Sequence, residues 1–206
     1  MIRRSLLAFV LCLFAALPLP VRAQDAPPPA GAVRVTLETS AGTILVETDP
    51  RAPITSANFL RYVEEGRFDG TDFYRGMELG AGTGVVQGGT ANAPDRILPP
   101  IAHESTTQTG LSHRDGTISM ARYEPGSATG DFSIMLSDQP GLDADPNAAD
   151  PDAQAGFAAF GRVVSGMDVV RAIFDAPTDP DKGEGWMKGQ MLARPVKIID
   201  ARRTDQ

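Results

Sequence analysis

Two short stretches of the chain combine strong hydrogen-bond donors with apolar neighbours and glycine. Arg75 follows two aromatic residues, and Gln87, twelve residues later, precedes two glycines. Arginine presents five N–H donors in one plane, glutamine both donates and accepts, and glycine lets a second backbone approach closely. This combination suits an extended peptide better than a metal ion or a phosphate group.

These stretches form part of a longer pattern. F-Y-R at 73–75, V-V-Q-G-G at 85–89 and G-T-I-S-M-A-R at 116–122 resemble the cyclophilin signature, F-H-R-V-I-P-G-F-M-I-Q-G-G followed by G-x-x-S-M-A-N. The resemblance runs from about Val33 to Arg202. Cyclophilins are peptidyl-prolyl cis-trans isomerases, so it implies an isomerase that acts on proline-containing polypeptides and needs no cofactor and no metal.

Rotation about an X-Pro bond is slow because the amide has double-bond character, with a barrier of about 18–20 kcal/mol. A donor aimed at the prolyl nitrogen favours the twisted amide, in which that nitrogen regains a lone pair. The resemblance assigns this donor to Arg75, and it assigns the holding of the substrate chain to Gln87 and the backbone near Arg122. It places the remaining substrate-binding positions at Tyr74, Val85, Ala121, Arg122, Asp131, Ser133 and Phe157.

The predicted proline pocket departs from the family pattern. Ser133 stands where cyclophilins have a phenylalanine, Asp131 replaces a glutamine, Gly84 replaces an aromatic residue, and four extra residues lie between Arg75 and Gln87. A buried aromatic ring contributes a few kcal/mol of apolar contact. The sequence therefore leaves two functions open: an active isomerase, or a non-catalytic proline-peptide-binding or chaperone module that has lost part of its pocket.

The N-terminal residues have the pattern of an export signal. Arg3 and Arg4 precede an apolar run at 6–17, two helix-breaking prolines follow, and Ala23 offers a cleavage point. We therefore expect a signal peptide at 1–23, an Ala/Pro-rich linker at 24–32 and one domain at 33–206. The apolar run is shorter than the roughly 20 residues needed to span a bilayer.

Composition restricts the compartment and the partners of the mature protein. Removal of residues 1–23 deletes three arginines and no acid, which changes the formal net charge from −7 to −10. An acidic protein of this kind is a poor partner for nucleic acid or anionic membranes. We expect a periplasmic monomer with no membrane anchor after signal cleavage.

The hydrophobic pattern predicts a mainly β domain. Alternating apolar residues indicate a hairpin around a turn at 40–42, and strands at 73–75, 85–87, 117–120, 132–136, 157–164 and 196–201. Helices are expected from Pro53 to Gly66, with Thr55 as N-cap, and at 167–174. The resemblance sharpens this to an eight-stranded antiparallel β-barrel capped by two α-helices. Phe132 and Phe160 are assigned to its core, and Trp186 to a loop packed on the barrel.

Overall fold

The computed structural model describes residues 30–204. The expected signal peptide and most of the expected linker lie outside the described residues. Within residues 30–204, no helix is both long enough and apolar enough to cross a membrane.

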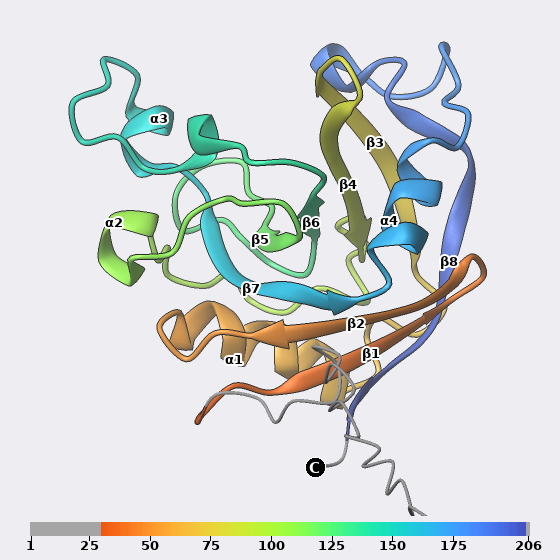
Figure 1. Cartoon of the computed structure of the whole chain (residues 1–206), viewed down its shortest axis with the longest axis horizontal. Coiled ribbons are helices and arrows are strands. Elements are labelled where there is room, and N and C mark those ends of the chain that lie inside the picture. The colour runs from red at the N-terminus through yellow and green to blue at the C-terminus, as the bar shows by residue number, and fades with distance from the viewer. Residues whose placement is uncertain (1–29, 205–206) are drawn as a thin grey trace, which may run out of the picture.

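Eight antiparallel strands close into a barrel, in the spatial order β1-β2-β7-β5-β6-β4-β3-β8 (Figure 1). The strands are β1 Arg34–Thr39, β2 Gly42–Thr48, β3 Asp72–Gly80, β4 Thr83–Gly89, β5 Thr117–Met120, β6 Phe132–Met135, β7 Ala158–Ser165 and β8 Met191–Arg203. Within residues 30–204, closure gives each of the eight strands a hydrogen-bonded neighbour on both sides. The predicted fold class is confirmed, although β8 begins five residues before the expected strand.

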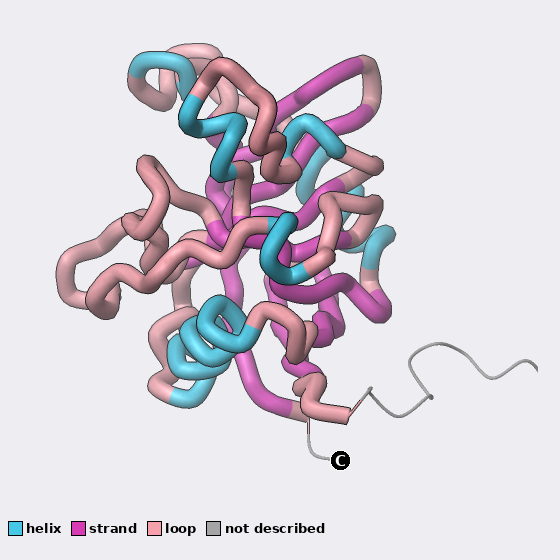
Figure 2. The backbone as a smooth tube through the Cα atoms, turned by 90° about the vertical axis from the view of Figure 1, so that its left-hand side faces the viewer, coloured by secondary structure: helices cyan, strands magenta, loops and turns pink. Residues whose placement is uncertain are grey.

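Two helices of two or more turns pack against the barrel, α1 at Pro53–Glu64 and α4 at Met167–Phe174. The short helices are α2 at Thr106–Thr109, α3 at Pro151–Ala155, and the 3-10 turns η2 at Pro140–Leu142 and η3 at Gly185–Met187. Figure 2 shows that loops and short helices make up much of the face that lies on the left in Figure 1. The connections, rather than the sheet, therefore shape this side of the molecule.

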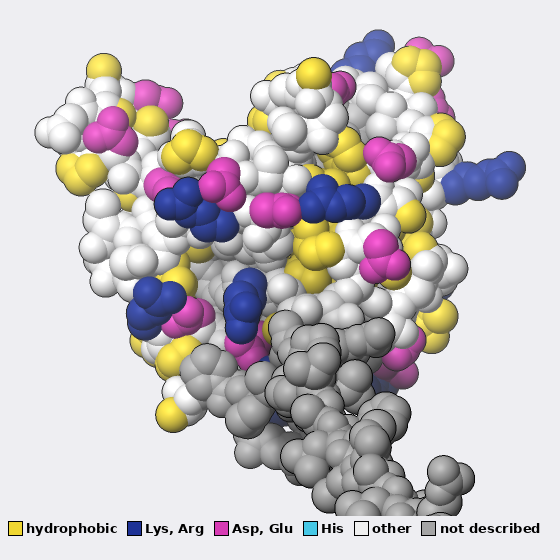
Figure 3. Space-filling view, viewed as in Figure 1, with side chains coloured by type: hydrophobic (Ala, Val, Ile, Leu, Met, Phe, Trp, Pro, Cys, Tyr) yellow, Lys and Arg dark blue, Asp and Glu magenta, His cyan; other side chains and the backbone are white. Residues whose placement is uncertain are grey.

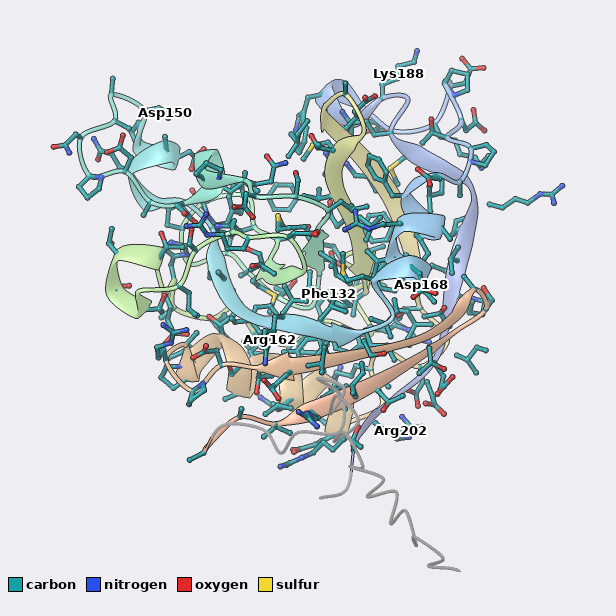
Figure 4. The ribbon with its side chains drawn as sticks, viewed as in Figure 1. Phe132, Asp150, Arg162, Asp168, Lys188 and Arg202 are labelled. Carbon is teal, nitrogen blue, oxygen red and sulfur yellow. The ribbon has the colours of Figure 1, made fainter. Side chains whose placement is uncertain are left out.

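Aromatic rings fill the barrel interior. Phe132, labelled in Figure 4, lies edge-on to Phe59 and Phe73 with ring centroids 5.4 and 5.7 Å apart. Phe160 joins the cluster through Phe59, at 5.3 Å. Each of these side chains is at most 1% exposed, and full burial of one such ring contributes about 1.5–3 kcal/mol. The assignment of Phe132 and Phe160 to the core is confirmed.

The N-terminus of α1 is capped from elsewhere in the chain, so the expectation of Thr55 as N-cap is wrong. The N-cap residue is Ala52, which has no side chain to accept a hydrogen bond. The buried carboxylate of Glu104 accepts instead from the backbone N–H of Ile54 and Thr55, at 3.1 and 2.7 Å, and from the Thr55 hydroxyl at 2.7 Å. A local capping rule could not predict a cap supplied by a residue 49 positions away.

A β-bulge at Tyr74 reorients the F-Y-R segment. Phe73 pairs with Gly88, yet Arg75 pairs with Gln87, so two steps along β3 correspond to one step along β4. Without the bulge, Phe73 and Arg75 would point to the same face of the sheet. With it, Phe73 enters the core while Arg75 faces outward.

A buried polar network anchors the loop between β6 and β7 to the barrel. His113 is fully buried; its Nδ1 lies 2.5 Å from a carboxylate oxygen of Asp143, and its Nε2 lies 2.8 Å from the Ser119 hydroxyl. Because a carboxylate only accepts, Nδ1 carries the proton and Nε2 accepts from Ser119. Asp143 also accepts from the Ser112 hydroxyl and the His113 backbone N–H. The neutral imidazole therefore ties the loop to β5.

This network predicts a pH-dependent stability. Burial lowers the pKa of His113 below its ordinary value, with Asp143 offsetting part of the effect. As the pH falls, the unfolded chain therefore protonates His113 at a higher pH than the folded chain does. The contribution of neutral His113 to the free energy of unfolding is fully present above about pH 6.5, and it is lost as the pH falls toward the folded-state pKa. We expect the urea-unfolding free energy of wild type relative to His113→Asn to fall by up to about 1.4 kcal/mol per pH unit below pH 6.5. A constant difference between pH 7.5 and 5 would contradict this.

Candidate active site

The strand register brings one row of side chains across the outer face of the barrel. Arg75 on β3 is paired with Met191 on β8 on one side and with Gln87 on β4 on the other. Gln87 is paired in turn with Ser133 on β6, and Ser133 with Ser119 on β5. Five strands thus contribute one residue each to the row that the bulge at Tyr74 makes possible.

This row forms the floor of a cavity of about 630 Å³. Figure 3 shows the molecular surface hollowed between two raised lobes at the top of the view. The lobes correspond to the loop that carries α3 and to the β3–β4 hairpin with the segment before β8 (Figure 1). All nine residues expected at the site line this cavity: Tyr74, Arg75, Val85, Gln87, Ala121, Arg122, Asp131, Ser133 and Phe157.

Arg75 is a buried cation whose partners are all neutral. Arg75 is only 3% exposed to solvent. Nε and Nη2 donate to Oε1 of Gln190 at 2.9 and 2.5 Å, Nη1 donates to Oε1 of Gln87 at 2.7 Å, and Nη2 also contacts the sulfur of Met77. Trp186 covers the guanidinium, 4.5 Å from ring centroid to Cζ. Burial lowers the pKa of Arg75, but arginine stays charged in proteins.

The hydrogen bonds leave defined donors for a ligand. Four of the five N–H groups of Arg75 have partners within residues 30–204, which leaves one on Nη1. Because Oε1 of Gln87 accepts from Arg75, the amide nitrogen is the donor of that side chain, and one of its two N–H groups is used by the hydroxyl oxygen of Tyr74. One N–H on Nη1 of Arg75 and the second amide N–H of Gln87 therefore remain as donors in the cavity.

The side of the cavity near Val85 is apolar. Val85 and Met135 are opposite one another on β4 and β6; each is at most 3% exposed, yet both lie outside the barrel core. Met77 is opposite Val85 on the other side, so Met77, Val85 and Met135 form an apolar row two residues along their strands from the row of Arg75, Gln87 and Ser133. The other apolar side chains that line the cavity include Leu142, Phe157, Trp186, Met187 and Met191. We call these apolar side chains the apolar wall, and its methionines, Met77, Met135, Met187 and Met191, the methionine wall. Methionine is flexible and polarisable, so it fills irregular gaps and adapts to different ligands.

Packing explains why position 84 is a glycine. A Cβ there would lie 2.1 Å from the carbonyl oxygen of Met77 and 2.8 Å from the ring of Phe174. Phe174, the last residue of α4, occupies the space beside the strand. A side chain at Gly84 is therefore excluded by the backbone of β3 at Met77 and by Phe174 of α4.

The opposite side of the cavity is polar and contains a buried carboxylate. Asp131 is 4% exposed and accepts from the backbone N–H groups of Ala91 and Asn92, at 2.7 and 3.2 Å. Both of these residues have positive φ, 49° and 55°, a conformation that side chains disfavour and that this carboxylate stabilises. Burial raises the pKa of Asp131 to about 6, and hydrogen bonds from Ala91, Asn92 and Thr90 offset part of the rise.

Arg122 braces the loop that carries α3. Its Nε and Nη2 donate to the carbonyl oxygen of Gly156, its Nη1 pairs with Asp152 at 2.9 Å, and its Cζ lies 4.7 Å from the ring centroid of Phe157. The side chain is thus engaged with the protein. Phe157 is held in place at the rim of the apolar side.

Several residues at the site have no signal in the sequence motifs. Gln190 is 115 residues from Arg75 and lies in no recognised pattern. Trp186 lies in the loop before β8 and packs on the barrel through Arg75 on β3, as expected, but its position over the guanidinium has no signal in the sequence. The methionine wall was also missed, because single methionines scattered along the chain are ordinary core residues in most folds.

Comparisons with known proteins identify the family. The family model described as cyclophilin type peptidyl-prolyl cis-trans isomerase/CLD matches residues 34–202. A peptidyl-prolyl cis-trans isomerase of Acinetobacter baylyi is 36% identical over 170 residues, which cover 80% of this chain and 82% of the relative. Peptidyl-prolyl cis-trans isomerase B of Escherichia coli is 37% identical over 144 residues, which cover 68% and 82%.

The fold agrees with solved structures. The crystal structure of a Cryptosporidium parvum cyclophilin type peptidyl-prolyl cis-trans isomerase superposes with a TM-score of 0.66 and 20% identity, over 85% of this chain and 99% of that one. The barrel, the cavity on its outer face and the match over residues 34–202 lead to one conclusion. This chain belongs to the cyclophilin-type peptidyl-prolyl cis-trans isomerases.

Proposed function

We propose that this chain accelerates cis-trans isomerisation of X-Pro bonds in exported polypeptides, with Arg75 donating a hydrogen bond to the prolyl nitrogen of the twisted amide. The observation that carries the proposal is the unused N–H on Nη1 of Arg75, beside the second N–H of the Gln87 amide, whose first N–H is used by the Tyr74 hydroxyl. Family membership supports the reaction itself.

The geometry of the two donors suits the electronic change in the reaction. As the amide twists, the prolyl nitrogen loses conjugation and becomes an acceptor, whereas in the planar ground state it is a poor one. A donor from Arg75 therefore binds the twisted state more strongly than either planar isomer, which lowers the barrier. The Gln87 amide donates to a carbonyl oxygen of the substrate and holds the chain in register.

The surroundings of Arg75 keep its charge available. Gln87 and Gln190 orient the guanidinium without neutralising it, and Trp186 shields it from water. In this low-dielectric site a charged donor interacts more strongly with an acceptor than it would in solvent. The arrangement is preorganised, so little reorganisation accompanies the reaction.

The apolar wall supports catalysis over a binding-only role. The alternative of a non-catalytic module rests on the departures at Gly84, Asp131 and Ser133. Met135 and Val85 pair across β4 and β6 two residues along from Ser133 and Gln87, and they give the proline ring an apolar surface. The pocket has changed its lining while keeping its apolar character.

Replacement of Arg75 tests the proposed donor. We expect Arg75→Lys to lower kcat/KM about a hundredfold or more, because a lysine ammonium cannot present the planar fork and one preorganised donor is worth about 10²–10³ in rate. The measurement is NMR exchange on Ala-Pro peptides. Arg114→Lys, at an ion pair whose arginine side chain is 68% exposed, is the matched control and should retain wild-type activity. A folded Arg75→Lys variant within threefold of wild type would refute the role of the guanidinium.

Export is the second part of the proposal, and the charge and apolar pattern of residues 1–23 support it. A periplasmic isomerase would bind unfolded chains soon after export, when their X-Pro bonds are still a mixture of cis and trans isomers. We expect the protein recovered from the periplasmic fraction to lack residues 1–23, as read by intact mass. Full-length protein confined to the cytoplasm would contradict export and leave the isomerase proposal unaffected.

A further inference from the structure

Sulfur-containing side chains gather around the proposed reaction site. Five of the six methionines within residues 30–204 line the cavity, the four of the methionine wall and Met120, and the sixth is Met167 on α4. The single cysteine of the chain, Cys12, lies within residues 1–23, so residues 30–204 contain no thiol. Peroxides oxidise a methionine thioether to a polar sulfoxide. An oxidant that enters this cavity therefore meets thioethers beside the groups proposed to carry out the reaction.

Met77 is the methionine that contacts the proposed donor. Its sulfur accepts from Nη2 of Arg75 at 2.8 Å, and the same residue is paired with Val85 in the apolar row. Met77 is half-buried and is followed by three exposed residues, whereas Met120 and Met135 are at most 2% exposed. A dissolved oxidant thus reaches the sulfur of Met77 before it reaches the two buried ones.

We propose that Met77 is an oxidation site, and that its sulfoxide slows the reaction at Arg75. The oxidant is a peroxide, with hydrogen peroxide as the simplest case. The sulfur lone pair attacks one peroxide oxygen, the O–O bond breaks and an S–O bond forms, so the sulfur loses two electrons. The second oxygen leaves as hydroxide, takes the proton of the transferred hydroxyl and becomes water. This inference rests on the proposed role of Arg75 in isomerisation.

The new oxygen disturbs the site on either face of the sulfur. An N–H···O hydrogen bond alone spans about 2.7–3.2 Å from nitrogen to oxygen. Nη2 of Arg75 and the sulfur are 2.8 Å apart, so an oxygen between them must push the guanidinium and the thioether apart. On the other face the oxygen adds a polar group to the apolar row, and burial of that group without a partner is unfavourable. Both epimers of the sulfoxide therefore weaken the site.

The test follows oxidation and activity in the same samples. Wild-type protein is treated with graded hydrogen peroxide, each sulfoxide is quantified by peptide mapping with mass spectrometry, and kcat/KM is measured by NMR exchange on an Ala-Pro peptide. We expect kcat/KM to fall about tenfold or more as Met77 is converted, because a displacement of about 1 Å at a preorganised donor costs up to about 10² in rate. Reduction by methionine sulfoxide reductases A and B, one for each epimer, should restore the activity.

Leucine variants assign the effect to one sulfur, because leucine is close to methionine in volume. Each variant is compared with itself, as the ratio of treated to untreated activity, so a changed basal rate does not enter. Met77→Leu should keep this ratio near one. Met187→Leu, from the same methionine wall, and Met167→Leu, outside the cavity, are the matched controls and should lose activity as wild type does.

Three results would overturn the proposal: full activity in wild type whose Met77 is oxidised, an unchanged loss in Met77→Leu, or slower oxidation of Met77 than of the buried Met135. Should Met77→Leu fail to fold, the double variant Met187→Leu/Met191→Leu decides, since its activity must still fall in step with Met77 sulfoxide. A wild type without isomerase activity would refute the proposed function alone. The NMR resonance of the Arg75 Nε–H should still shift when wild type is oxidised, and an unmoved resonance would then overturn the role of Met77.

Discussion

The structure of the site depends on how a buried guanidinium is held. Arg75 is inaccessible to bulk water, and a carboxylate partner would be the usual means of stabilising it. Here two glutamine side chains, a thioether sulfur and an indole ring surround it instead. Neutral partners fix the orientation of the fork and leave its charge uncompensated. The surrounding barrel must therefore be rigid enough to maintain a cation that a substrate acceptor can use, and closure of the sheet provides that rigidity.

Placement of the guanidinium follows from small departures from regular strand geometry. The bulge at Tyr74 places Phe73 and Arg75 on opposite faces of the sheet. Gly88 leaves room for the ring of Phe73 inside the barrel, because a Cβ at Gly88 would lie 2.7 Å from that ring. At Gly89 a Cβ would lie 2.4 Å from the carbonyl of Gly130, so the two glycines after Gln87 serve the packing of both faces. The Q-G-G segment is thus a structural requirement as well as a recognition motif.

Sequence reasoning predicted the fold and the local motifs well, because both depend on patterns that are contiguous in the chain. Alternation predicted the β1–β2 hairpin, the spacing of Val170 and Ile173 predicted α4, and the nine expected site residues line one cavity. What it missed depends on contacts between distant segments. Gln190 and Trp186 reach Arg75 from a loop more than a hundred residues away, Glu104 caps α1 from another loop, and the methionine wall is assembled from several strands. No local pattern encodes such contacts, so only the folded chain reveals them.

The central claim is that the charge of Arg75 must remain uncompensated, and Gln190→Glu tests it most directly. The change is nearly isosteric and would convert a neutral acceptor of Nε and Nη2 into a carboxylate. Our account predicts that isomerase kcat/KM falls about tenfold or more, because an adjacent carboxylate weakens donation to the substrate. The new ion pair offsets the loss of the hydrogen bond that Nε2 of Gln190 donates to the Trp186 carbonyl oxygen, so the free energy of unfolding should change little. Gln108→Glu adds the same charge at an exposed position of α2, where glutamate can keep the hydrogen bond accepted from the Ser105 N–H, and should leave kcat/KM unchanged. Wild-type activity in a folded Gln190→Glu protein would contradict the account.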